Sequence, residues 1–217
     1  MEGDNMRNIL FAAIGILIIC SLGFFTADDL SSDSNFNGSE IFPIPSEEGL
    51  YPEYTYKELT EISDLIVMGQ FISFEEAKWT TSDGKQPDGV KITKNVDSEG
   101  YEYIDFILDT SESIYTDSVF QINEYFKGKA DSDKIVIRFY SGIVGMLQAG
   151  DNKGLNADEY TENKPVVFYL TKSESKTEDG INYYVIVTPK GALSVEGNAL
   201  VNPYGEKITF EEIKSLN

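Results

Sequence analysis

An uncharged apolar run near the N-terminus constrains this chain more than any other feature of its sequence. The run extends from Ile9 to Phe25 and continues through Thr26 to Ala27. A helix rises about 1.5 Å per residue, so this run is just long enough to cross a hydrocarbon core of about 30 Å. We therefore expect residues 9–27 to be a single transmembrane helix, with the membrane as its partner.

The charges that flank the run predict its orientation. Arg7 precedes the run, Asp28 and Asp29 follow it, and the next basic residue is Lys57. Positively charged flanks stay in the cytoplasm. We expect residues 1–8 to be a cytoplasmic tail and the rest of the chain to lie outside the cell.

Two other fates of the run stay open. Cleavage as a signal peptide would release a secreted protein, although a cut after Ala27 places bulky Phe25 where a small residue is preferred. Lipid attachment at Cys20 is the other alternative, and there bulky Ile19 precedes the cysteine where a small residue is usual. Without either modification, Cys20 is a small apolar residue that faces lipid.

The segment after the run is predicted to be a flexible acidic stalk. Residues 28–50 are rich in Ser, Asp, Asn, Glu and Pro and show hardly any aliphatic periodicity. Asn37-Gly38-Ser39 is a glycosylation sequon, which makes Asn37 a candidate glycosylation site. Residues 51–217 are then the extracellular domain.

Charge and side-chain chemistry exclude several classes of partner. The chain has 17 basic and 37 acidic residues and a net charge of −20, which repels nucleic acid. It has no histidine, and its single cysteine lies in the apolar run. The extracellular domain therefore forms no internal disulfide and no Cys/His zinc site.

Hydrophobic periodicity predicts a mainly β domain. Alternating or continuous apolar patterns of strand length occur in seven segments. These are residues 65–72, 101–108, 119–126, 134–140, 166–170, 183–187 and 192–195. Gly69 interrupts the first of them and indicates a bulge, and residues 79–100 are predicted to form a loop or an irregular hairpin.

Two short helices are predicted to flank the strands. Thr55 and Glu58 form a capping-box pattern that begins the first, and Thr209 and Glu212 form the same pattern at the end of the chain. Seven strands at close spacing, with short flanking helices, indicate a small β-barrel or a sandwich.

The order of these pieces resembles a poorly characterised family of exported, membrane-anchored proteins of archaea and Gram-positive bacteria. The segments that carry the resemblance are Ser63–Gly69, Tyr115–Phe120, Tyr125–Gly128, Pro165–Leu170 and Gly191. The same order is distantly similar to netrin-like domains, which include tissue inhibitors of metalloproteinases. This resemblance implies an OB-like barrel of five strands.

The resemblance implies little about function. Those inhibitors approach the zinc of a protease with an N-terminal cysteine, and residues 51–217 contain no cysteine. Inhibition by that mechanism does not carry over to this chain.

One long segment between strands is the best candidate for a binding loop. Residues 142–164 separate two predicted strands, and long loops on a β scaffold often carry binding sites. Their oxygen ligands make calcium the one cofactor to consider, with Asp151, Asn156, Asp158 and Glu159 as candidate ligands. Lys153 and a spacing unlike known calcium loops favour a simple solvated loop instead.

No motif predicts catalysis. Ser82/Lys85 and Ser173/Lys176 have the spacing that lets a lysine activate a serine, but both pairs lie in segments predicted to be polar loops. We expect no catalytic residue.

The resulting hypothesis is a non-enzymatic cell-surface module that binds an envelope protein, a glycan or a cation. The alternatives are a carboxylate-dependent hydrolase of envelope polymers and an inhibitor that acts on an extracellular peptidase through a loop.

Overall fold

The computed structural model describes residues 41–43, 52–150, 155, 157, 160 and 164–216, all within one compact unit, Phe36–Asn217. Strands make up 48% of the structure, so the domain is mainly β, as the sequence predicts. Among the described residues, no helix is long and apolar enough to cross a membrane. The predicted membrane segment, residues 9–27, and the glycosylation candidate, Asn37, lie outside the described residues.

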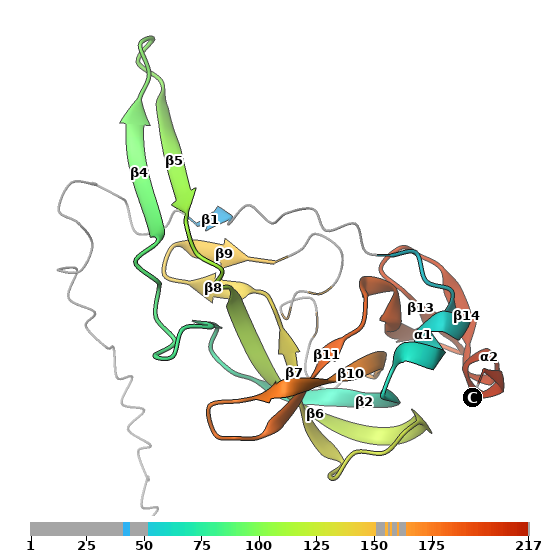
Figure 1. The fold of residues 1–217 in the computed structure, drawn as a ribbon. Helices are drawn as coiled ribbons and strands as arrows, with labels where there is room; N and C mark the ends of the chain where they lie inside the picture. Colours follow the sequence, from blue (N-terminus) through green and yellow to red (C-terminus); the bar gives the residue numbers. More distant parts are fainter. Residues whose placement is uncertain are drawn as a thin grey trace, which may run out of the picture. The chain divides into compact units, whose positions relative to one another are not determined.

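Five strands pair in an order that returns to its starting point (Figure 1). They are β2 (Leu65–Phe74), β6 (Ile114–Lys127), β7 (Lys134–Phe139), β11 (Asn182–Ile186) and β10 (Val166–Lys176). Strand β2 pairs with β6, β6 with β7, β7 with β11, β11 with β10, and β10 with β2. All of these pairings are antiparallel except that of β7 with β11. Each strand covers or extends a segment predicted from the sequence.

Strand β10 explains why some of these segments are continuously apolar. Val166, Phe168 and Leu170 belong to one buried cluster, to which all five strands contribute side chains. Val167 and Tyr169, on the opposite face of the strand, belong to a second buried cluster. Both faces are therefore dry, and the alternation expected of a half-exposed strand is lost.

The second cluster lies beneath two helices. Helix α1 (Tyr56–Ile62) contributes buried Leu59, and helix α2 (Phe210–Ser215) contributes buried Ile213. Both helices begin with the predicted capping boxes, at Thr55 and at Thr209.

Three short strands extend the sheet from β10 towards α2. They are β12 (Ala192–Glu196), β13 (Ala199–Val201) and β14 (Lys207–Thr209), and the 3-10 turn Pro189–Gly191 precedes them. The sequence predicts the first of them. The other two have three residues each, which is too short to show a period.

Gly69 forms the predicted bulge. The register between β2 and β6 shifts at Met68/Gly69. A Cβ at this position would lie 2.0 Å from the backbone oxygen of Gln121 and 2.6 Å from the Phe120 ring. Only glycine permits so close an approach of the two strands.

The segment predicted as a loop or irregular hairpin contains regular structure. Strand β3 (Lys78–Trp79) pairs with β6, and β4 (Val90–Val96) pairs over its full length with β5 (Glu102–Leu108). Figure 1 shows β4 and β5 as a two-stranded sheet of their own. Strand β4 alternates only at Val90 and Ile92, which pack with Trp79, and this pattern is too short to stand out within the polar residues 79–100.

A further small sheet contains strands that the sequence does not predict. Strand β9 (Leu147–Ala149) pairs with β8 (Gly142–Val144) on one side and with β1 (Phe42–Pro43) on the other. The candidate loop 142–164 therefore begins with a hairpin. Strand β1 comes from the segment predicted as a stalk, so that part of residues 28–50 belongs to the β domain. Backbone pairing of two or three residues leaves no periodic signal in the sequence.

A buried ion pair joins β6 to β7. Arg138 Nε and Nη2 each donate a hydrogen bond of 2.7 Å to Asp117, whose Cα lies opposite that of Arg138 in the ladder. The guanidinium carbon lies 3.7 Å from the centre of the Tyr115 ring and 4.0 Å from that of Tyr183. The pair is therefore bidentate and enclosed by two aromatic rings.

We predict that Asp117→Asn destabilises the domain by about 3–5 kcal/mol, because it leaves the Arg138 charge buried without its counter-charge. Urea unfolding followed by the fluorescence of Trp79, the single tryptophan of the chain, measures the change. Asp88→Asn, at an exposed position, is the control and should have little effect. Equal stability of the two variants would contradict a structural role for the pair.

Candidate functional site

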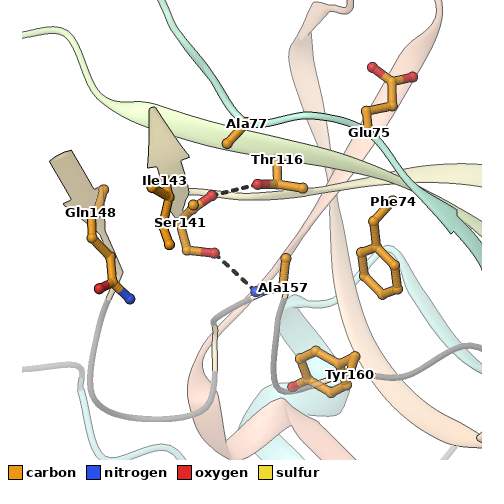
Figure 2. Close-up of a pocket in the computed structure, with 11 residues that line it drawn as sticks. Phe74, Glu75, Ala77, Thr116, Ser141, Ile143, Gln148, Ala157 and Tyr160 are labelled. Carbon is orange, nitrogen blue, oxygen red and sulfur yellow. Dashed lines mark hydrogen bonds between the residues drawn. The ribbon is translucent and has the colours of Figure 1, made fainter. Parts of the chain in front are cut away.

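A pocket of about 410 Å³ lies where the end of β2, the start of β6 and the β7–β9 segment meet. This volume lies within the range of small-ligand sites, about 300–1,000 Å³. Figure 2 shows its lining side chains. They are Phe74, Glu75, Ala77, Thr116, Ser141, Gly142, Ile143, Gln148, Ala149, Ala157 and Tyr160.

A glycine allows the wall of the pocket to form. Gly142 has a φ of +143°, a conformation that side chains with a Cβ rarely adopt. A Cβ there would also lie 2.4 Å from Ala77 Cβ and 2.7 Å from Thr116 Oγ1. Strand β8 can therefore lie close to β6 and to the turn after β2 only because residue 142 is glycine.

Two hydrogen bonds fix the polar part of the wall. Thr116 Oγ1 donates to the carbonyl oxygen of Ser141 over 2.7 Å, and the backbone N–H of Ala157 donates to Ser141 Oγ over 3.0 Å (Figure 2). Both side chains are buried. They connect β6, the β7–β8 junction and the segment around Ala157, so their oxygens serve the structure of the pocket.

Aromatic rings form the apolar side of the pocket. The Phe74 ring centre lies 4.8 Å from that of Phe71, and the Tyr160 ring centre lies 5.5 Å from the same ring. Tyr160 also contacts Phe139 and Phe168 at centre-to-centre distances of 5.4 Å. The apolar wall is thus continuous with the main core, and aromatic pairs at these distances attract one another.

Charge at the pocket is confined to Glu75 among the lining residues. Its carboxylate lies 3.8 Å from Lys78 Nζ, and its side chain is 53% exposed. Lys78 Nζ lies closer, at 3.3 Å, to Glu178, to which it donates a hydrogen bond.

Lys78 is thereby shared between two carboxylates. Partial burial works against its charge, but the hydrogen bond to Glu178 and the nearby charges outweigh burial and raise the pKa of the Lys78 ammonium above its ordinary value. The lysine stays protonated and interacts mainly with Glu178. The carboxylate of Glu75 is therefore only partly paired with Lys78.

The lining residues suit binding better than catalysis. Hydrolysis by paired carboxylates requires two such groups about 5–9 Å apart, and the described lining residues include Glu75 as their single carboxylate. Within the part of the chain that the structure describes, no group of three or more Asp, Glu, His or Cys side chains could hold a metal ion. An apolar wall with a few polar groups is typical of a ligand-binding pocket.

The loop that the sequence singles out supplies much of this lining. Six of the lining residues lie within residues 142–164, and Gly142, Ile143, Ala149 and Tyr160 are among them. The segment was singled out for its length and its oxygen ligands, whereas its contribution to the pocket is mainly apolar.

The structure does not describe the proposed calcium ligands. Asp151, Asn156, Asp158 and Glu159 lie outside the described residues, so the calcium hypothesis stays a prediction.

Neither serine–lysine pair forms a catalytic arrangement. Ser82 and Lys85 are both exposed. Ser173 and Lys176 lie in strand β10 and not in the loop expected for them. Strand β10 is irregular between Lys172 and Lys176, and Lys176 is exposed, so the pair lacks the helical turn on which this spacing brings a lysine beside a serine.

Sequence reasoning missed the half of the pocket that comes from the first strands. No motif marks these side chains, and they meet residues 142–164 only through the pairing of β2 with β6 and the approach of β8. They are Phe74, Glu75, Ala77 and Thr116. The glycine at 142 was the one available signal, because an isolated glycine can indicate close backbone contact.

Comparison with known proteins adds no relative. No protein-family model matches the chain, and no curated protein matches it either.

Two serines near the pocket should respond oppositely to substitution. Ser141→Ala removes the acceptor of a buried N–H and should cost about 1–3 kcal/mol. Ser118, which faces Phe74 across the β2–β6 ladder, is buried and its hydroxyl has no hydrogen-bond partner. Ser118→Ala should leave the free energy of unfolding unchanged or slightly higher.

Urea unfolding of both variants, again followed by Trp79 fluorescence, measures the difference. A loss of stability in Ser118→Ala as large as that in Ser141→Ala would show that the Ser118 hydroxyl is hydrogen bonded.

Proposed function

We propose that this chain is a membrane-anchored module of the cell surface that binds an envelope protein through the pocket. The observation that carries the proposal is the apolar pocket itself, built from two distant parts of the chain and held open by Gly142 and the hydrogen bonds of Ser141. We propose in addition that the domain is an OB-type barrel.

The strand order supports the barrel. Strands β2, β6, β7, β11 and β10 each pair with two others of the five, as the strands of a closed five-stranded Greek-key barrel do. The one parallel pair joins β7 to β11. Strand β10 lies between these two strands in the sequence, so the chain crosses over before it reaches β11, as a Greek key requires. This arrangement agrees with the netrin-like resemblance expected from the sequence.

The chemistry of the lining favours a protein ligand over a glycan or a cation. A cation such as calcium takes six to eight oxygen ligands, whereas the described lining residues include one carboxylate, and the hydroxyl oxygens of Thr116 and Ser141 already take part in hydrogen bonds. Glycans expose many hydroxyl groups that need polar partners when buried. An apolar side chain of a protein needs only the surface that Phe74, Ile143 and Tyr160 provide.

The same lining favours binding over hydrolysis of envelope polymers. Among the lining residues that the structure describes, Glu75 has no second carboxylate to act as its partner. A single exposed carboxylate next to an apolar wall is better suited to recognise a ligand than to cleave one.

Residues 9–27 supply the membrane part of the proposal. They are uncharged, and the only basic flank is on their N-terminal side. A stalk of at most about 20 residues then separates this segment from the domain, so the pocket would act close to the cell surface.

The topology is tested with epitopes at the two ends of the full chain. We expect antibody to reach a C-terminal epitope on intact cells, and to reach an N-terminal epitope only after permeabilisation. A C-terminal epitope that is accessible only in permeabilised cells would contradict the proposed orientation, and its release into the medium would show cleavage.

Photo-crosslinking on intact cells tests the binding function. We expect p-benzoylphenylalanine at position 143, where Ile143 lines the pocket and is 47% exposed, to crosslink a discrete envelope protein. Position 72 is the matched control, because Ile72 is 40% exposed and does not line the pocket.

A second variant shows whether the pocket itself is responsible. Ala77→Leu, which narrows the pocket, should abolish the crosslink from position 143. Ala199→Leu, at a partly buried alanine of β13 that does not line the pocket, should leave it intact. Identical crosslinks from positions 143 and 72 would argue against a specific site.

A further inference from the structure

The pocket combines an apolar interior with a negative charge at its edge. Phe74, Ala77, Ile143 and Tyr160 give the interior its apolar surface. Glu75, the neighbour of Phe74 in the chain, carries the only formal charge among the described lining residues. The ligand that complements both features has an apolar group and a positive charge next to each other.

Within the part of the chain that the structure describes, Glu75 shares its positively charged partner with a second carboxylate. Lys78 is the only cation with an ion pair to Glu75 among the described residues, and it lies 0.5 Å closer to Glu178. One ammonium therefore serves two carboxylates, and the three groups together carry one surplus negative charge. The other nearby ion pair, Asp117 with Arg138, is neutral as a whole.

The net charge of the whole chain also favours a basic partner. A net charge of −20 attracts a basic partner over distances comparable with the Debye length and repels an acidic one. It therefore speeds the encounter with a basic segment before the apolar side chain enters the pocket.

The size of the pocket limits what enters it. A volume of about 410 Å³ holds one large side chain with part of the backbone that carries it, and not a helix or a folded domain. Aromatic side chains suit the interior best, because Phe74 and Tyr160 can pair with a third ring.

We propose that the pocket binds a basic protein segment in which a bulky aromatic or aliphatic side chain stands next to a lysine or arginine. The apolar side chain enters the pocket between Phe74, Ile143 and Tyr160, and the neighbouring cation pairs with Glu75. The proposal rests on the function proposed above and names the chemistry of the partner for that same site.

Short blocked peptides test this on the full chain in detergent micelles. The probes are acetyl-Gly-Lys-Phe-Lys-Gly-amide, its analogue with alanine for phenylalanine, and its analogue with glutamate for both lysines. Calorimetry at low salt measures the affinity. Fluorescence of Trp79, which packs in a cluster with the lining residues Ala77 and Ala149, gives a second readout. We expect the first peptide to bind at least about tenfold more tightly than either analogue.

Two neighbouring glutamates provide a matched pair of variants. Glu75→Gln should weaken the Lys-Phe-Lys peptide roughly three- to fivefold and reduce the salt dependence of its binding. Glu76→Gln removes the same charge from an exposed position that does not line the pocket, and should leave the affinity unchanged. Ala77→Leu should abolish binding.

Each other outcome overturns a defined part of the proposal. Equal binding of the lysine and glutamate peptides, with Glu75→Gln unchanged, would refute the basic segment and leave an apolar protein ligand in place. Phenethylamine has the ring and the amine without a peptide. If it bound as tightly as the Lys-Phe-Lys peptide, the ligand would be a small cationic amine and not a protein segment. No binding of any peptide at millimolar concentration would refute the inference, while the crosslink from position 143 would still test the proposed function separately.

Discussion

Strands β2 and β10 lie side by side as antiparallel partners, and this ladder joins the two apolar clusters of the domain. Residues of β10 alternate between the cluster inside the five paired strands and the cluster beneath α1 and α2. The paired parts of the two strands, residues 65–69 and 166–170, are almost entirely buried and carry a large share of the apolar surface removed from water. The helices, the C-terminal strands and the ring of pairings all depend on this ladder for a surface to pack against.

The pocket follows from how the opposite end of β2 leaves that core. Beyond Phe71 the strand loses its burial, and Phe74, Glu75 and Ala77 turn towards β6 and β8. Gly142 lets β8 approach, while Ser141 and Thr116 satisfy the backbone groups that this approach buries. The result is an apolar surface next to an incompletely paired carboxylate, a combination that the rest of the fold does not require.

Two kinds of electrostatics coexist in the domain. Asp117 and Arg138 form a closed, buried pair between two tyrosine rings, and it contributes to structure. Glu75, Lys78 and Glu178 form an open group at the surface with a surplus of negative charge. Only the surface group can bind a further partner, because the donors and acceptors of the buried pair are already used and out of reach of solvent.

The sequence by itself determined the β character of the domain, most of its long strands, the bulge at Gly69 and both capping boxes. Each of these follows from local chemistry: periodic apolar residues, a glycine inside a strand, or a Thr and a Glu three residues apart. The sequence also indicated residues 142–164 as the best candidate for a binding loop. Only the tertiary structure brought Phe74, Glu75, Ala77 and Thr116 to that segment, because their meeting depends on strand pairing between residues far apart in the chain. The short strands also became visible only in the tertiary structure, since backbone ladders of two or three residues leave no pattern in the side chains. These are β1, β8, β9, β13 and β14.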